Sequence, residues 1–294
     1  MTVDILLPFW GDPALLRRAV DSVLRQELDD WRLVIVDDCY PDPTVRTWCL
    51  SLDDERVSYH RNETNLGANR NYQRAVGLAE HEYAVIMGAD DVMHPNYLDV
   101  VTRVAQRFDR PAVIQPGVMV IDEHDRPVLP LVDRVKSWLR PSVRAATEFA
   151  GEELARRLLT GNWTYFPSLC WRRDVLDRIG FREGFDVVQD LAMLLDVSLD
   201  GGRMVLDPEI AFSYRRHGAS DSGVRTRSGH RFDEERRVFA TFASEMQAAG
   251  WRRAARAAHV HATSRLHALS LLPGAVADRD LRAGSRLIAH GLGR

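Results

Sequence analysis

The sequence contains one lysine, three cysteines and no long hydrophobic run, and each shortage excludes a class of protein. No stretch approaches the roughly 18 consecutive apolar residues that a transmembrane helix needs. The cysteines are odd in number and lack a Cys-x-x-Cys spacing, which argues against a disulfide framework and a zinc site. Lys136 belongs to no Walker A motif, and no Gly-x-Gly-x-x-Gly fingerprint is present. Two common ways of binding a nucleotide are thereby excluded.

The composition is otherwise that of an ordinary globular protein, with 294 residues, 45% of them hydrophobic and 28% charged. A net charge of −3 is too small to indicate a nucleic-acid partner. The chain begins directly with an apolar strand and shows no signal-peptide pattern. We therefore expect a cytoplasmic protein that does not bind nucleic acid.

In the first part of the chain, short apolar strands alternate with amphipathic helices. Strands are predicted at residues 3–7, 33–36, 57–60 and 83–87. Helices are predicted after Asp12-Pro13, after Gly67 and after Pro95. This alternation is typical of βαβ units, so we predict an α/β fold with a mostly parallel sheet flanked by helices.

The alternation weakens after residue 121. Residues 112–121 are expected to form one or two strands, residues 122–141 a loop, and residues 204–206 and 211–214 two short strands. Helices are predicted at 152–159, 174–179 and 189–199, and throughout the chain after Arg231. We divide the chain into an α/β half (1–121), a second half (122–230) and a helical C-terminal appendage (231–294).

Three predicted strands end in residues suited to binding a ligand: Pro8-Phe9-Trp10, Asp37-Asp38 and Asp90-Asp91. The carboxyl ends of parallel strands meet at one edge of a sheet, where ligands collect. Asp38 suits an N–H of a nucleotide base, with Phe9 or Trp10 packed on the base. Asp90 and Asp91 suit a hard cation such as Mg²⁺ or Mn²⁺. The alternative is that these aspartates only cap turns and helices.

A second group of candidates precedes Pro167, where Trp163 and Tyr165 place aromatic rings beside amide and hydroxyl groups. Such a surface suits stacking on an acceptor sugar. Core packing is the alternative explanation for these aromatic residues.

The order of several short motifs resembles that of family-2 glycosyltransferases with the GT-A fold. The matching segments are Pro8-Phe9-Trp10-Gly11, Ser22-Val23-Leu24-Arg25-Gln26, Val36-Asp37-Asp38, Asn65-Leu66-Gly67, Arg70-Asn71, Gln189-Asp190 and Tyr214-Arg215-Arg216-His217. The family often has Asp-Ala-Asp-Asp where this chain has Gly88-Ala89-Asp90-Asp91, so the first carboxylate is absent here. The match is close over about the first third of the chain and thinner up to Ser222.

The resemblance implies an inverting transfer of a sugar from a nucleoside-diphosphate sugar to an acceptor hydroxyl. Pro8, Phe9, Trp10, Asp38, Asn65, Arg70 and Asp90 would bind the nucleotide. Asp90, Asp91 and His217 would bind Mg²⁺ or Mn²⁺, which offsets the charge that grows on the leaving diphosphate. Asp190 would be the catalytic base, with Asp186 and Asp196 as nearby competitors. Trp163 and Tyr165 would contact a glycan, lipid-linked or small-molecule acceptor.

Several alternatives remain open from the sequence. The arginine-rich C-terminal helices are expected to pack on the main domain or on a second copy, while a peripheral contact with the inner face of the membrane is the alternative. A sugar-phosphate nucleotidyltransferase is a rival function, although its basic glycine-rich phosphate loop is missing after the first strand. A non-catalytic module that binds nucleotide or glycan is the other.

Overall fold

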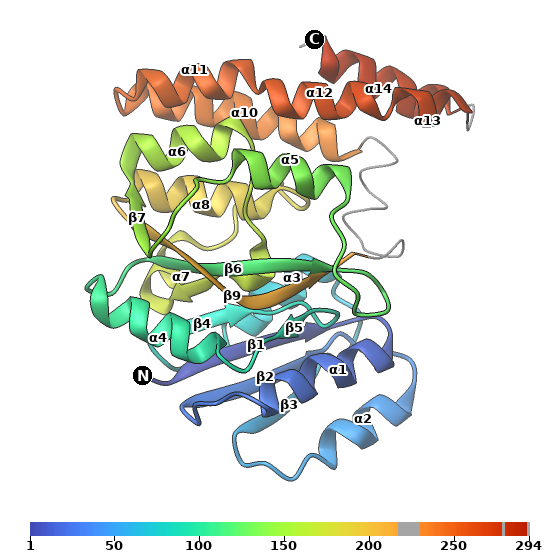
Figure 1. Ribbon diagram of the computed structural model, residues 1–294. Coiled ribbons are helices and arrows are strands. Elements are labelled where there is room, and N and C mark those ends of the chain that lie inside the picture. Colours follow the sequence, from blue (N-terminus) through green and yellow to red (C-terminus); the bar gives the residue numbers. More distant parts are fainter. Residues whose placement is uncertain (217–229, 278–279, 293–294) are drawn as a thin grey trace.

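The computed structural model describes residues 1–216, 230–277 and 280–292. Within them, nine strands form one mixed sheet in the order β3-β2-β1-β4-β8-β6-β9-β5, and β7 pairs with β9 outside this path. Helices cover both faces of the sheet (Figure 1). The predicted α/β fold with C-terminal helices is confirmed.

The first half of the sheet is parallel. It contains β1 (Val3–Phe9), β2 (Trp31–Asp37), β3 (Val57–Arg61) and β4 (Tyr83–Ile86). The helices between them are α1 (Pro13–Leu24), α2 (Pro43–Leu50) and α3 (Ala68–Val76), and α4 (Tyr97–Arg107) follows. The α1 helix begins as expected, because the Asp12 carboxylate accepts a hydrogen bond from the Ala14 N–H at 2.7 Å.

The second half of the sheet is mixed. It contains β8 (Cys170–Arg172), β6 (Val113–Ile121), β9 (Arg203–Arg215), β5 (Val92–Met93) and β7 (Thr147–Ala150). The prediction of two short strands at 204–206 and 211–214 is wrong, because these residues belong to the single strand β9, which has 13 residues. β9 stays continuous because its pairing with β6 shifts register at Gly117 of β6. A Cβ at Gly117 would lie 2.7 Å from the carbonyl oxygens of Pro208 and Glu209 in β9.

The segment 122–141, expected to be a loop, contains helix α5 (Leu131–Leu139). Its polar side chains hold it in place: Asp133 is buried beneath it, and the Lys136 ammonium donates to the Thr164 carbonyl oxygen at 2.7 Å. The remaining elements of this half are α6 (Gly151–Thr160), a 3₁₀ turn η1 (Phe166–Ser168), α7 (Arg173–Ile179) and α8 (Gln189–Leu199).

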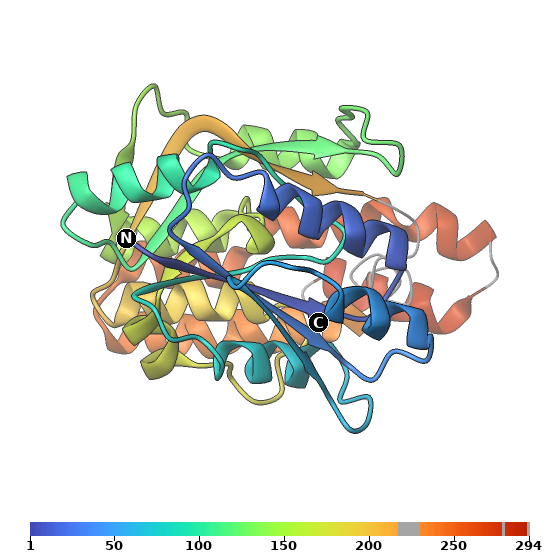
Figure 2. The ribbon, with the colours of Figure 1, turned by 90° about the horizontal axis from the view of Figure 1, so that it is seen from below.

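Two hydrophobic cores lie on the two faces of the sheet. One contains the buried faces of α1, α2 and α4, and the other those of α3, α6, α7 and α8 together with α10 and α11. The C-terminal helices α10 (His230–Ala248), α11 (Arg252–Val260), α12 (Ala262–Ser270), α13 (Leu272–Ala277) and α14 (Leu281–Gly291) form an outer layer beyond α5, α6 and α8 (Figures 1 and 2). No helix among the described residues is long and apolar enough to cross a bilayer.

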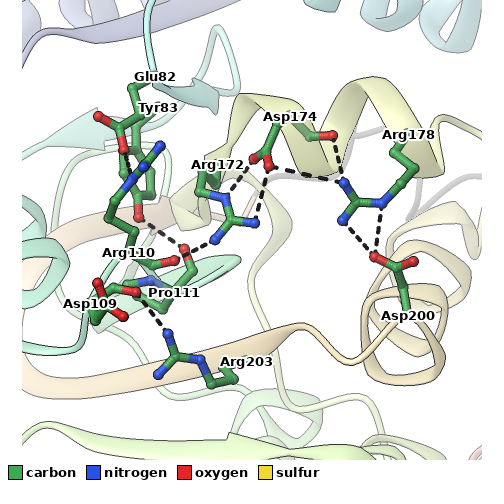
Figure 3. A network of polar contacts seen from close by, with 10 residues as sticks. All are labelled: Glu82, Tyr83, Asp109, Arg110, Pro111, Arg172, Asp174, Arg178, Asp200 and Arg203. Carbon is green, nitrogen blue, oxygen red and sulfur yellow. Dashed lines mark hydrogen bonds and ion pairs between the residues drawn. The ribbon is translucent and has the colours of Figure 1, made fainter.

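A polar network joins the sheet at the end opposite to the aspartate pairs (Figure 3). The Arg172 guanidinium donates to the Asp174 carboxylate and to the Arg110 carbonyl oxygen, while Arg203 at the start of β9 donates to the Asp109 carbonyl oxygen at 2.7 Å. The Tyr83 hydroxyl at the start of β4 donates to the Pro111 carbonyl oxygen at 2.9 Å. The network therefore fixes β4 and β9 at one end, and both strands lead to the candidate site at the other.

Candidate active site

The ends of β1 and β2 lie side by side, because Phe9 and Asp37 are register partners. Phe9 is buried, whereas the Trp10 side chain is 54% exposed and its ring meets the edge of Tyr40 at 5.4 Å. Tyr40 also packs against Phe9, with ring centroids 5.1 Å apart. Pro8 is buried in β1. Of the predicted Pro8-Phe9-Trp10 platform, Trp10 is therefore the ring that presents a face to solvent.

Asp38 is buried and is already bound by three donors from the chain. Its carboxylate accepts from the Asn62 side-chain amide at 2.7 Å and from the N–H groups of Leu66 and Gly67 at 2.7 and 2.9 Å. Asp38 thus shapes the turn that presents Asn65, whose own Oδ1 also accepts from the Gly67 N–H at 3.1 Å. Any contact with a base would come in addition to these bonds.

Arg70 lies in the first turn of α3, directly after that turn, and its side chain is exposed. A neighbouring cation, Arg61, was not singled out from the sequence. Its guanidinium pairs with the buried Asp37 carboxylate at 2.6 Å, and the Tyr59 hydroxyl donates to the same oxygen. The edge around Asp38 therefore carries two arginines from different elements, of which Arg61 is already paired.

Asp91 is the most perturbed carboxylate of the site. Its side chain is 1% exposed, Oδ1 accepts from the Arg215 N–H at 2.8 Å, and Oδ2 has no hydrogen-bond partner among the described residues. Burial raises the pKa of Asp91 well above its ordinary value of 3.8, and the neighbouring charge of Asp90 raises it further. A buried carboxylate oxygen without a partner would be satisfied by a bound cation or by a hydrogen-bond donor of a ligand.

Gly88 lies directly against these two carboxylates. A Cβ at this position would lie 2.5 Å from Asp91 Oδ2 and 2.9 Å from Asp90 Oδ1. The glycine that replaces the family's first aspartate therefore leaves the room in which the Asp91 side chain lies.

Arg215 at the end of β9 holds the loop that carries Asp90 and Asp91. Its guanidinium is buried and donates to the Asp90 carbonyl oxygen at 2.6 Å, the Asp122 carbonyl oxygen at 2.8 Å and the Asp125 carboxylate at 2.5 Å. Arg216 turns the other way and binds Asp133 through two hydrogen bonds of 2.8 and 3.0 Å. Neither pairing could be foreseen from the Tyr-Arg-Arg-His motif alone.

The residues present fit a divalent cation in part. Asp90 and Asp91 supply adjacent carboxylates, and the orphaned Asp91 Oδ2 is the oxygen that a cation would satisfy. Among the described residues, no group of three or more His, Cys, Asp or Glu is gathered for a metal. The predicted third ligand, His217, lies outside the described residues.

Asp190 lies in the first turn of α8, as predicted, and is half-buried. The Asn162 side-chain amide donates to its Oδ2 at 2.8 Å, which orients the carboxylate. The two competing acids have other partners: Asp196 pairs with Arg182, and Asp186 accepts from Asn69. Asp190 and Asp186 are therefore each held by a neutral amide, whereas Asp196 is paired with an arginine; Asp190 is half-buried and Asp186 is exposed.

Lys136 is a functional candidate that sequence reasoning missed. Burial, followed by the charge of Arg216, lowers its pKa to about 8, although Asp190 acts in the opposite direction. Its ammonium also lies 4.5 Å from the ring centroid of Tyr165. The one signal in the sequence was that no other lysine exists.

The two predicted acceptor residues lie next to Lys136. Trp163 is fully buried, and Tyr165 is almost so. The Tyr165 hydroxyl donates to Asp133 Oδ1 at 3.1 Å, and its ring packs on Tyr214 with centroids 5.1 Å apart. Both aromatic residues line a cavity of about 420 Å³ beneath α5, so any ligand would reach them from inside that cavity.

The parallel strands β1 to β4, with aspartate pairs at their carboxyl ends, fit the GT-A fold expected from the motifs. The chain belongs to glycosyl transferase family 2, whose model matches residues 4–180. The family resemblance expected from the motifs is thereby confirmed.

Individual relatives share parts of the chain. A putative colanic acid biosynthesis glycosyl transferase, WcaA of Escherichia coli, is 36% identical over 99 residues, which are 33% of this chain and 36% of that protein. Among solved structures, TarS of S. aureus with UDP-GlcNAc has a TM-score of 0.64 at 16% identity, covering 82% of this chain and 66% of TarS. A mannosyltransferase of Pyrobaculum calidifontis, solved with GDP-Man and Mn²⁺, has a TM-score of 0.62 at 16% identity, covering 99% of this chain and 86% of the mannosyltransferase chain. These two structures support the fold.

Proposed function

We propose that the protein transfers a sugar from a nucleoside-diphosphate sugar to an acceptor hydroxyl, with inversion at the anomeric carbon. The observation that carries the proposal is the buried Asp91 carboxylate with an unpartnered oxygen, at the strand edge where a glycosyltransferase of this family would bind its donor. The nucleotide sugars named for TarS and for the Pyrobaculum enzyme are consistent with such a donor.

The proposed base is Asp190. The Asn162 amide fixes Oδ2, so Oδ1 is the oxygen that would accept the proton of the acceptor hydroxyl while that oxygen attacks the anomeric carbon. The acceptor proton becomes acidic only as the new bond forms, so an ordinary carboxylate suffices. A direct attack of this kind gives inversion.

Mg²⁺ or Mn²⁺ would be held by Asp91 and Asp90, with His217 as the predicted third ligand. When bound, such an ion neutralises charge on the diphosphate. The chain's own contribution is to position the two carboxylates: Arg215 fixes the loop, and Gly88 leaves room for both side chains. Trp10, Asn65 and Arg70 would contact the nucleotide from the neighbouring strand ends, with Pro8, Phe9 and Asp38 shaping the same edge.

We further propose that residues 1–121 bind the donor and residues 122–230 supply the acceptor site and the base. The role of residues 231–294 in a membrane contact or a homodimer stays a prediction. Exposed apolar side chains on α12 and α14, such as Leu266 and Ile288, are the surface that either contact would use.

The proposal is tested first by nucleotide binding. Thermal unfolding is measured with UDP, GDP, dTDP and CDP, each with and without Mn²⁺. One nucleotide should raise the unfolding temperature by several degrees at about 100 times its dissociation constant. If none of the four changes it, the proposed function is wrong.

The base is tested by Asp190→Asn with the donor so identified. Release of sugar to water or to an acceptor should fall by about 100-fold or more, because a general base is lost, while the nucleotide response is kept. Asp186→Asn is the matched control, since it removes a nearby acid that accepts from Asn69. Equal sugar release by Asp190→Asn and wild type would reject Asp190 as the base.

A further inference from the structure

The cavity beneath α5 combines an apolar wall with cationic groups. Its volume is about 420 Å³, and Val118, Val120, Val128, Leu129, Trp163 and Ile210 form much of its lining. This volume lies within the range of small-molecule sites. The charged residues that line it are Asp133, Lys136 and Arg140.

The charges in this lining do not cancel. Asp133 is matched by Arg216, which binds both of its carboxylate oxygens, and Asp133 Oδ1 also accepts from Tyr165. Lys136 donates to a neutral carbonyl oxygen, and so does Arg140, to that of Asp207 at 3.3 Å. Two cations of the lining therefore have no acidic partner among the hydrogen bonds and ion pairs of the described residues.

Two buried donors in the lining also lack an acceptor. Trp163 is fully buried and its indole Nε1–H has no hydrogen-bond partner among the described residues, and the same holds for Arg140 Nε–H. Buried donors are normally paired, and leaving one unpaired costs free energy. Because both N–H groups are themselves buried, a ligand in the cavity would reach them only after the wall has moved.

The cavity is connected to the proposed base by a chain of hydrogen bonds. Lys136 donates to the Thr164 carbonyl oxygen, the Thr164 hydroxyl donates to Asn162 Oδ1 at 2.6 Å, and the Asn162 amide donates to Asp190. A ligand in the cavity would therefore lie beside the residues that orient Asp190.

We propose that this cavity binds the acceptor as an amphiphile, with an apolar chain along the wall and an acidic head group facing Lys136 and Arg140. This inference rests on the proposed function, because it names the class of acceptor for the same site. Leu129 and Ile210 in the lining are about half exposed, so the apolar wall reaches the mouth of the cavity.

The test uses short-chain amphiphiles on the whole protein, measured by calorimetry below their micelle concentration. Butyl, hexyl and octyl phosphate vary the chain, octanoate and octanol vary the head group, and inorganic phosphate lacks the chain. Each buried methylene should lower the dissociation constant about fourfold until the cavity is full. Octyl phosphate or octanoate should bind tighter than octanol. The tighter of these two acids indicates whether the head group of the acceptor is a phosphate or a carboxylate.

Ser137→Phe tests the location. Ser137 is an exposed helical residue that lines the cavity, and its hydroxyl donates only to the Arg134 carbonyl oxygen one turn back, so a ring here fills space without a core change. Ser285→Phe is the matched control, because Ser285 makes the same bond to the Arg282 carbonyl oxygen on α14. Ser137→Phe should weaken octyl phosphate at least tenfold and Ser285→Phe should not.

Lys136→Met tests the head-group contact. It should abolish the preference for an acidic head over octanol while the dependence on chain length remains. The inference is overturned if octyl phosphate binds no tighter than butyl phosphate, or if Ser137→Phe binds it as wild type does. Nucleotide stabilisation is measured in parallel, so failure of the proposed function is recognised separately from failure of the cavity.

Discussion

Asp91→Asn should stabilise the metal-free protein while removing its response to metal. The wild-type carboxylate is 1% exposed, one oxygen has no partner, and Asp90 carries a like charge beside it. The amide keeps the Oδ1 acceptor for the Arg215 N–H but carries no charge. The substitution removes the cost of burying a charge beside Asp90, while the amide N–H₂ takes the unpartnered place of Oδ2; the free energy of unfolding should therefore rise by about 1–3 kcal/mol near neutral pH.

The stability gained by Asp91→Asn should be larger at neutral pH than at acidic pH. Because the pKa of Asp91 is raised in the folded state, the native protein holds a proton that the unfolded chain releases above about pH 4. The stability of the wild type therefore falls as pH rises from the unfolded pKa towards the folded one. At acidic pH the variant and the wild type should converge.

Urea unfolding in EDTA between about pH 5 and pH 8 measures this difference, and the same titration with Mn²⁺ and the bound nucleotide measures the metal response. At 100 times the dissociation constant, ligand adds about 2.7 kcal/mol to the wild type and should add much less to Asp91→Asn. Asp99→Asn is the control, since Asp99 is half-exposed and pairs with Arg103 on the surface of α4. A variant less stable than wild type in EDTA at neutral pH would refute the reasoning.

Two further substitutions test the architecture around this carboxylate. Gly88→Ala should lower the free energy of unfolding by about 1–3 kcal/mol and weaken nucleotide binding with Mn²⁺, because its methyl group overlaps Asp91 Oδ2. Gly284→Ala, in open space within α14, is the control and should stabilise the protein slightly. Thermal unfolding compares the two variants. Arg215→Met should lower the free energy of unfolding in urea by about 1–3 kcal/mol, because the carbonyl oxygens of Asp90 and Asp122 lose their donor. Arg103→Met, on the surface, should lower it by less than about 1 kcal/mol. Equal losses would show that the Arg215 guanidinium does not hold the loop of Asp90 and Asp91.

The parallel half of the fold could be predicted because its sequence pattern and its burial agree. The residues from Val3 to Leu7 are buried and, apart from Asp4, apolar, and Asp12-Pro13 carries both signals of a helix start. Since parallel strands end at one edge, the approximate meeting of the aspartate pairs also followed from the sequence.

The α5 helix could not be predicted because its pattern is reversed. Leu131 and Trp138 are 67% and 75% exposed, whereas Asp133 is fully buried against Arg216 and Tyr165. A periodicity argument assumes that apolar side chains face the core. Here tertiary ion pairing and the cavity beneath the helix decide its orientation.

The hydrogen-bond partners of the site residues could not be predicted from the sequence either. Arg215 binds Asp90 and Asp125, and Asn162 binds Asp190, across separations of 28 to 125 residues. The strand ends indicate where acids gather, but which donor each acid receives depends on how the two halves pack. Lys136 was missed for the same reason, since its pKa is lowered first by burial and then by the charge of Arg216, which is distant in sequence.

The solitary lysine also makes the protein unusually simple to label. An ordinary lysine with a pKa of 10.5 stays protonated at mildly alkaline pH, but an amine with a pKa of about 8 is largely in its nucleophilic form. An amine-reactive dye would therefore modify a single side chain, at the cavity wall and a short hydrogen-bonded path from Asp190, in addition to the N-terminal amine. A fluorophore attached there would report on occupancy of the site in the otherwise unaltered sequence.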